Sequence, residues 1–152
     1  MNCFKQIIEN SEVWLQYAVR LNNLNDSKDN LKELRAQVIS DARIEKYLND
    51  ITDFHSILVR NHKNPDLPIH KLIFLLNIVL DTDIPPIQSA VNEIMAHKDE
   101  NGIYQYLTNI PKHFGGSGKD MFSRCICDAP LLLYALLKGG IDYKQHVKQG
   151  VD

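Results

Sequence analysis

The side chains best suited to chemistry lie close together in the C-terminal third of the chain. Arg124, Cys125, Cys127 and Asp128 fall within five consecutive residues. Thiolates and carboxylates can bind a metal ion, and a guanidinium can bind a phosphate or a carboxylate. A glycine-rich loop, residues 115–118, precedes them and an apolar segment follows. Because glycine lets the backbone approach a ligand closely, we expect a binding site here.

A metal site is not the preferred interpretation of these residues. Structural zinc sites usually have two to four residues between paired cysteines and a second pair of ligands, and Cys125 and Cys127 offer neither. Two small buried residues with Asp128 as the N-cap of the following helix explain the pattern. His55 and His62, seven residues apart, are expected to share a helical face, with turn-forming asparagines near His62 rather than further ligands. We therefore predict no metal and no cofactor.

Charge near the glycine-rich loop indicates an anionic ligand rather than a nucleotide. The loop lacks the Gly-x4-Gly-Lys-Ser/Thr spacing of a phosphate-binding loop. Lys119 and Arg124 can still meet a phosphate or carboxylate by charge, and His97 and His113 are expected near the same cavity as Arg124. The chain has no Gly-x-Ser-x-Gly nucleophile motif. The predicted ligand-binding residues lie within or beside this segment: Tyr104, His113, Lys119, Asp120, Phe122, Arg124, Cys125 and Cys127.

The elements that must position these residues are predicted to be helices almost throughout. Apolar residues recur at intervals of three and four, the spacing of one helical face. The predicted helices cover residues 11–23, 28–39, 44–58, 68–80, 85–96 and 131–138. Ser40 or Asp41, Asp83 and Asp142 are the expected N-caps of helices that follow them. Residues 103–107 are expected to be briefly extended, and residues 108–121 to form a long loop.

Composition narrows the class of protein. The chain has 152 residues, 44% of them apolar and 24% charged, which predicts a single globular domain. A formal charge of −2 argues against nucleic acid as a partner. The longest apolar run, residues 72–80, is shorter than the ~20 residues of a membrane span. Three cysteines and no secretory pattern at the N-terminus predict a cytoplasmic protein with reduced thiols.

Residues 84–138 resemble one helical hairpin of the α/α toroid of protein prenyltransferase β subunits and terpenoid cyclases. The resemblance is carried by the turn Asp99-Glu100-Asn101-Gly102-Ile103-Tyr104, by the segment Lys119-Asp120-Met121-Phe122-Ser123-Arg124-Cys125-Ile126-Cys127 and by the apolar residues 131–137. It implies an all-α fold of antiparallel helical hairpins, a partial or fragmentary toroid. Residues 1–152 would then be a single helical domain that forms the N-terminal part of a longer toroid.

The resemblance does not extend to the catalytic groups of those enzymes. Prenyltransferases hold a zinc ion with an Asp, a Cys and a His, and Ser123 occupies the position of that histidine here. The turn with Asp99 also lacks a cysteine. The Asp-rich motif of terpenoid cyclases has its nearest counterpart in Asp81-Thr82-Asp83, which lacks the third acid and is interpreted as a helix-capping turn.

Three functions therefore remain open. The first is a non-catalytic toroid-like domain that binds an apolar or anionic small molecule, or a protein partner, along its inner helices. The second is a fragment of a prenyltransferase- or cyclase-like enzyme. The third is a helical-repeat scaffold that binds protein. An exposed concave side would be covered by ligand, by self-association or by a missing C-terminal half.

Overall fold

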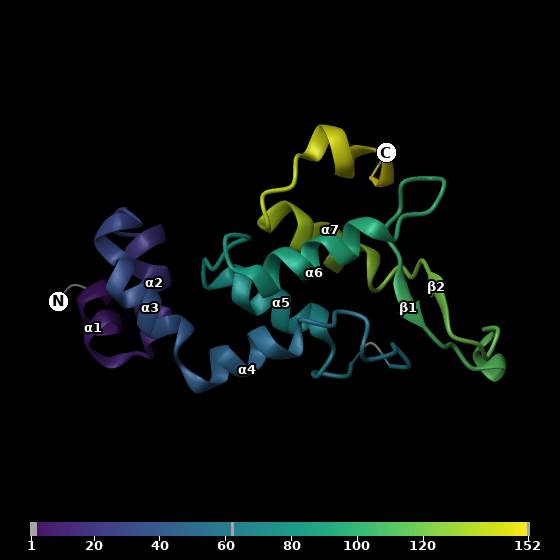
Figure 1. The fold of residues 1–152 in the computed structure, drawn as a ribbon, viewed down its shortest axis with the longest axis horizontal. Helices are drawn as coiled ribbons and strands as arrows, with labels where there is room; N and C mark the ends of the chain where they lie inside the picture. The colour runs from purple at the N-terminus through teal and green to yellow at the C-terminus, as the bar shows by residue number, and fades with distance from the viewer. Residues whose placement is uncertain (1–2, 62, 152) are drawn as a thin grey trace.

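The fold is mostly helical, with one small β-hairpin. The structure is a computed structural model that describes residues 3–61 and 63–151. Seven α-helices and two strands carry the labels of Figure 1: α1 (Cys3–Asn10), α2 (Val13–Asn22), α3 (Lys32–Ile39), α4 (Ala42–Asp50), α5 (Pro68–Asn77), α6 (Pro85–Ala96), β1 (Tyr106–Thr108), β2 (Met121–Ser123) and α7 (Ala129–Lys138). Four shorter helical turns complete it: Asp29–Leu31, Lys112–Phe114, Tyr143–Val147 and Lys148–Gly150.

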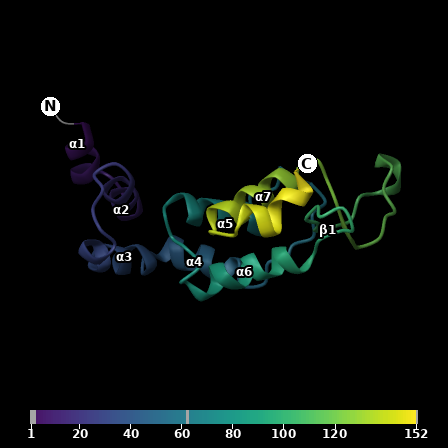
Figure 2. The same ribbon diagram turned by 90° about the horizontal axis from the view of Figure 1, so that it is seen from above.

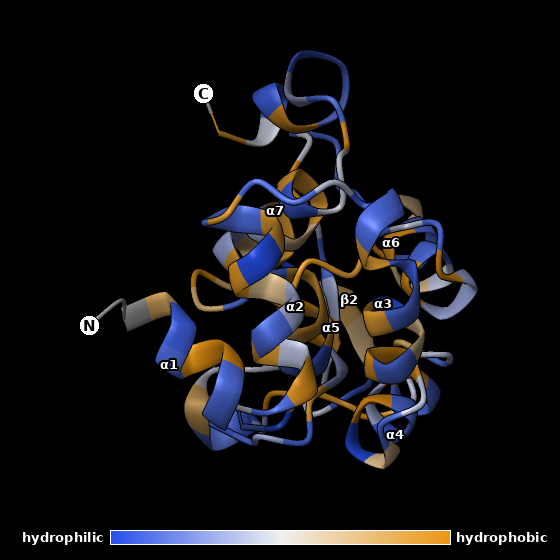
Figure 3. Cartoon of the chain, turned by 90° about the vertical axis from the view of Figure 1, so that its left-hand side faces the viewer, coloured by the Kyte–Doolittle hydropathy of each residue, from blue (hydrophilic) through white to orange (hydrophobic). Residues whose placement is uncertain are grey.

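Helix α5 forms the centre of the core, as its nearly continuous apolar sequence predicts. It contacts α4 and α7, and α6 contacts α4 and α7 in turn. Leu72 and Leu75 of α5, Ile87 and Val91 of α6, and Leu136 of α7 are fully buried. Figure 2 shows α6 running alongside α5 and α7, and Figure 3 shows hydrophobic residues gathered around α5. No helix within residues 3–61 and 63–151 has the length and apolar content needed to cross a membrane.

The N-terminal helices α1–α3 join this core through aromatic contacts and ion pairs. The Phe74 ring of α5 lies edge-on to Trp14 of α2, with ring centroids 5.4 Å apart, and edge-on to Tyr47 of α4 at 5.5 Å. On the turn before α6, Asp81 pairs with Lys28 and Asp83 pairs with Arg35. The proposed cap role of Asp83 is therefore wrong: its carboxylate bonds Arg35, and the N-cap of α6 is Ile84, which makes no side-chain cap bond.

The helix predicted over residues 44–58 is also wrong in its second half, because α4 ends at Asp50. Tertiary contacts replace the helical hydrogen bonds that its periodicity favours. The Phe54 side chain is buried, and its carbonyl accepts from the Tyr106 hydroxyl at 3.3 Å. The Val59 N–H donates to the Leu107 carbonyl at 3.0 Å. The turn after α4 is therefore attached to β1 rather than continued as helix.

The extended segment predicted over residues 103–107 is confirmed in part by β1, and most of the loop predicted over residues 108–121 is the connection between two strands that form an antiparallel hairpin. Tyr106 pairs with Ser123, Leu107 with Phe122 and Thr108 with Met121. Each strand has only three residues, too few for an alternating pattern to stand out in the sequence. Both ribbon views place this hairpin at the opposite end of the molecule from α1 (Figures 1 and 2).

The N-cap of α4 provides a test of helix stability in this core. The Asp41 carboxylate accepts from the backbone N–H of Arg43 at 2.9 Å. We expect Asp41→Ala to lower the free energy of unfolding by about 1 kcal/mol in urea titrations at pH 7. Hydrogen bonds from the Arg43 side chain and backbone lower the pKa of Asp41 to about 2. Stabilisation by the ionised group is therefore complete above about pH 4 and is lost as the pH falls toward that lower pKa.

The matched control is Asp41→Asn, which retains a capping oxygen but cannot ionise. Its difference from the Ala variant should not change with pH in this range. A deficit of the Ala variant relative to the unsubstituted protein that stays constant down to pH 2 would contradict the role assigned to the carboxylate charge.

Candidate functional site

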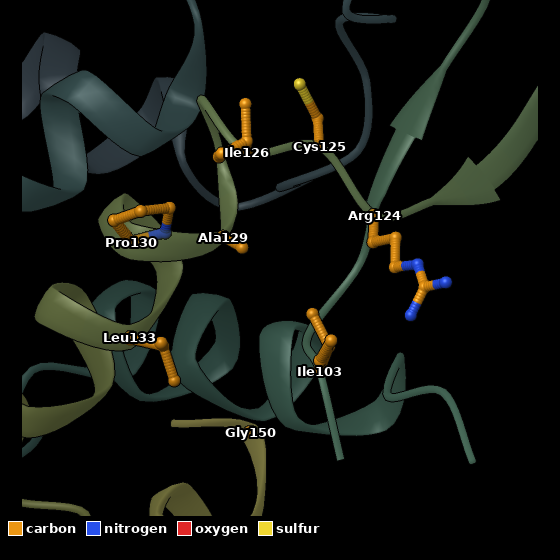
Figure 4. A pocket seen from close by; sticks show the side chains of 8 residues that line it. All are labelled: Ile103, Arg124, Cys125, Ile126, Ala129, Pro130, Leu133 and Gly150. Carbon is orange, nitrogen blue, oxygen red and sulfur yellow. The ribbon is translucent and has the colours of Figure 1, made fainter. Parts of the chain in front are cut away.

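A pocket lies where the link from β2 to α7 meets the C-terminal turn. Its volume is about 470 Å³, within the range of small-molecule sites. Figure 4 shows the side chains that line it, which come from four segments of the chain. They are Ile103, Arg124, Cys125, Ile126, Ala129, Pro130, Leu133 and Gly150. The lining is apolar except for the arginine and the thiol, so the pocket suits an apolar group.

Arg124 supplies the positive charge at the edge of this pocket. Figure 4 shows its guanidinium directed away from Ala129 and Pro130, on the far side of the apolar lining. One guanidinium nitrogen lies 3.6 Å from the Asp99 carboxylate, and 60% of the Arg124 side chain is exposed. The other oxygen of Asp99 accepts from the backbone N–H groups of Asn101 and Ile103, each at 2.9 Å. Asp99 therefore shapes the turn that carries Ile103 into the pocket and holds Arg124 beside it.

The C-terminal turn closes one side of the pocket by close backbone packing. A Cβ atom added to Gly150 would lie 2.5 Å from the carbonyl oxygen of Gly102, so only glycine fits between these two turns. Gly102 itself has a φ of +81°, a conformation that other residues rarely adopt. The Tyr104 hydroxyl donates to the carbonyl of His146 at 2.9 Å and ties the same turn down. Tyr104 is buried, so its place is beneath the C-terminal segment rather than in the pocket lining.

The two cysteines lie in the link before α7, and the prediction that they are buried with Asp128 as a side-chain cap is wrong, because the Asp128 side chain makes no cap bond. The Cys125 carbonyl accepts from the N–H groups of Asp128 and Ala129, and the Cys125 sulfur accepts from the Cys127 N–H at 3.4 Å. Cys125 is half-buried in the pocket wall, and Cys127 is exposed. A hydrogen bond to Cys125 raises the pKa of the Cys127 thiol.

Three other predicted site residues lie at the tip of the hairpin, away from the pocket lining. His113 is exposed in the turn Lys112–Phe114, with its ring 4.2 Å from that of Phe114. Lys119 is exposed, and the Asp120 carboxylate accepts from the Asn109 amide at 2.6 Å. The structure thus brings Arg124 and Cys125 together and leaves His113, Lys119 and Asp120 apart from them.

Phe122 belongs to a different cluster, on the side of β2 that faces α6. Its ring stacks on that of His97, with centroids 3.6 Å apart and planes 9° from parallel. The His55 ring lies edge-on to both, 5.1 Å from His97 and 5.0 Å from Phe122. Glu93, one helical turn before His97, brings a carboxylate to the same place.

The sequence alone predicted a different grouping of His55 and His97. It placed His55 on a helical face with His62, but His55 lies in the turn after α4, and His62 is outside the described residues. It expected His97 near Arg124. The spacing of Glu93 and His97 on one helix was a usable signal, because residues i and i+4 share a face. No signal in the sequence connects either of them to His55.

The acids Asp81 and Asp83 form a separate surface network on the turn before α6. Asp81 bonds Lys28, and Arg35 lies between both acids. Against the effect of burial, a hydrogen bond with Asp83 and the nearby Lys28 and Arg35 lower the pKa of Asp81 to about 2, and the same hydrogen bond raises the pKa of Asp83. The pair links α3 to the turn between α5 and α6, a structural role.

Compared with protein families, curated proteins and solved structures, this chain has no match.

The close approach of Gly150 to Gly102 generates a prediction about the pocket wall. We expect Gly150→Ala to lower the free energy of unfolding by roughly 1–3 kcal/mol, because the added methyl overlaps a backbone oxygen that cannot rotate away. Urea unfolding would measure the loss, and hydrogen exchange would locate faster opening in residues 143–150.

The control for this prediction is Lys144→Ala, an exposed position in the same C-terminal segment. It should change stability by no more than about 0.5 kcal/mol. Equal stability and equal exchange rates for the Gly150 variant and the unsubstituted protein would show that the two turns are not packed as described.

Proposed function

We propose that this protein is a non-catalytic binding module for a small molecule that has an apolar body and an anionic group. The observation that carries the proposal is the apolar pocket at the start of α7 with the exposed Arg124 guanidinium at its edge. Ile103, Ala129 and Leu133 would surround the apolar part of the ligand. Arg124 would turn from Asp99 toward the anionic group, because a guanidinium can form two parallel hydrogen bonds to a carboxylate or phosphate.

The toroid-like arrangement is part of this proposal. Helices α6 and α7 are in contact, and the turn at residues 99–103 and the β-hairpin connect them. This order of elements supports one hairpin of an α/α toroid, with α7 as the inner helix next to the ligand. An enzyme of the prenyltransferase or cyclase group is less well supported, because Ser123 shares a 2.6 Å hydrogen bond with Thr108 where that family has a zinc-binding histidine.

A protein partner is the second candidate, and one observation favours it. Ile126, on the rim of the pocket, is 90% exposed. Tyr134 and Leu137 on the outer side of α7 are 40% and 45% exposed. An apolar side chain this exposed beside a pocket is typical of a surface that another molecule covers. Self-association through this surface would make ligand binding depend on protein concentration.

The decisive experiment compares octanoate with 1-octanol by isothermal titration calorimetry. These ligands share an apolar chain and differ in charge. We expect octanoate to bind roughly tenfold more tightly or better, and we expect Arg124→Gln to abolish most of that difference, since charged hydrogen bonds contribute about 1.5–3 kcal/mol when fully formed. Arg60→Gln, at an exposed arginine outside the pocket, is the matched control and should leave the preference intact.

A second pair of variants tests the pocket itself. Leu133→Trp fills the cavity and should abolish binding of both ligands. Leu137→Trp, one turn later on α7 and outside the lining, should bind as the unsubstituted protein does. Equal binding by the two tryptophan variants would refute the assignment of the pocket. Binding that instead changes with protein concentration, together with self-association, would favour the partner surface.

A further inference from the structure

We propose that His55, Glu93 and His97 form a binding site for a divalent transition-metal ion such as Zn²⁺. Each residue offers one ligand atom, and these atoms all lie within 4.8 Å of one another. The three side chains come from two segments that are far apart in the sequence, the turn after α4 and the end of α6. No residue of this cluster lines the pocket at the start of α7.

The backbone fixes where these three side chains begin. Glu93 and His97 are four residues apart at the end of α6, so they extend from the same face of the helix. The His97 N–H closes the last helical turn on Ile94 at 3.3 Å, and its carbonyl accepts from the Gln105 N–H at 2.9 Å. His55 follows Phe54, whose carbonyl is bonded to Tyr106 of β1. All three positions are therefore set by hydrogen bonds that do not involve the side chains of the cluster.

The His55 side chain is the observation that points most directly to a ligand. Both of its ring nitrogens are buried, and neither has a hydrogen-bond partner. Buried polar atoms in native proteins almost always have a partner, so an orphaned imidazole calls for an explanation. A metal ion would satisfy one of these nitrogens. His97 and Glu93 are the neighbouring groups with which His55 could share it.

Aromatic rings hold the two imidazoles in orientation. Phe122 stacks on His97, while Phe54 and Tyr106 both lie edge-on to His55, with centroids 5.3 and 5.4 Å from its ring. Burial and the nearby His97 lower the pKa of His55, against the opposite effects of Glu93 and Asp53.

The set of donors indicates the class of metal. Two imidazoles and one carboxylate match zinc sites that keep an open position for water, and imidazole also suits other first-row transition metals. Ca²⁺ and Mg²⁺ prefer sites made of oxygen ligands. Ligands about 2.0–2.2 Å from a tetrahedral ion are roughly 3.3–3.5 Å apart, so binding would draw the three groups closer. Glu93 is exposed and its long side chain can make that movement without a change in the backbone.

The test titrates metal-depleted full-length protein with Zn²⁺ by calorimetry and with Co²⁺ by visible absorption. We expect one equivalent to bind, with a cobalt spectrum characteristic of fewer than six ligands. Glu93→Gln and His55→Ala should each weaken binding at least tenfold. The exposed Glu93 is the more informative position, because its isosteric substitution leaves the buried rings in place.

Two controls use the same chemistry elsewhere in the chain. His113→Ala removes an exposed histidine at the hairpin tip, and Cys125→Ser with Cys127→Ser removes the two thiols at the start of α7. Both should bind metal as the unsubstituted protein does. Circular dichroism confirms that each variant is folded. Absence of stoichiometric binding, unchanged affinity in Glu93→Gln, or loss of binding in either control would overturn the proposed site.

Discussion

The attachment of the turn after α4 to strand β1 is the constraint on which the functional half of the molecule depends. Tyr106 is fully buried, and its hydroxyl donates to the Phe54 carbonyl at 3.3 Å. Val59 donates to Leu107 and accepts from Asn109, which forms one parallel bridge between Val59 and Thr108 of β1. A buried tyrosine must place its hydroxyl on a partner, and this requirement sets the position of the whole turn relative to the hairpin.

The hairpin then distributes two different chemistries along one strand. Within β2, Phe122 faces the histidine cluster, where its ring covers His97. Immediately after β2, Arg124 reaches the rim of the apolar pocket. The two sites need different surroundings. The histidine cluster needs nitrogen and carboxylate ligand atoms close together, and the pocket needs an apolar wall with charge only at its edge. Strand β2 is paired with β1 along its whole length, so a shift in register would break the pairing of Tyr106 with Ser123. This fixed register positions Phe122 and Arg124 at their two sites.

The success of sequence reasoning followed the strength of the local signal. The helices α2, α5, α6 and α7 have continuous apolar periodicity and were predicted at nearly their observed positions. The Asp41 cap was also predicted correctly, because its acceptor and donor lie two residues apart. The end of α4 was not predicted, since contacts with residues about fifty positions away decide it. The extended segment predicted over residues 103–107 overlaps β1, whereas β2 was not predicted. Arg124 and Cys125 are neighbours in the sequence and could be assigned to one site. His55 and Glu93 are far apart in the sequence, so no local pattern linked them. The likeness to an α/α toroid stays a prediction.

The failure of the helix prediction after Asp50 coincides with the position of His55. Residues 51–58 have a helical pattern of apolar positions, but they form a turn and lack the backbone hydrogen bonds of a helix. Local preference and final structure usually agree in natural proteins, and exceptions concentrate at sites that serve a function. Here the exception carries an imidazole into a ring of aromatic side chains and leaves both of its nitrogens without a partner. A structural role alone would be met better by an apolar residue at position 55, because leucine or phenylalanine would fill the same space without an unsatisfied polar atom. The presence of histidine at this position therefore argues for a bound ligand, and Glu93 and His97 indicate that the ligand is a metal ion.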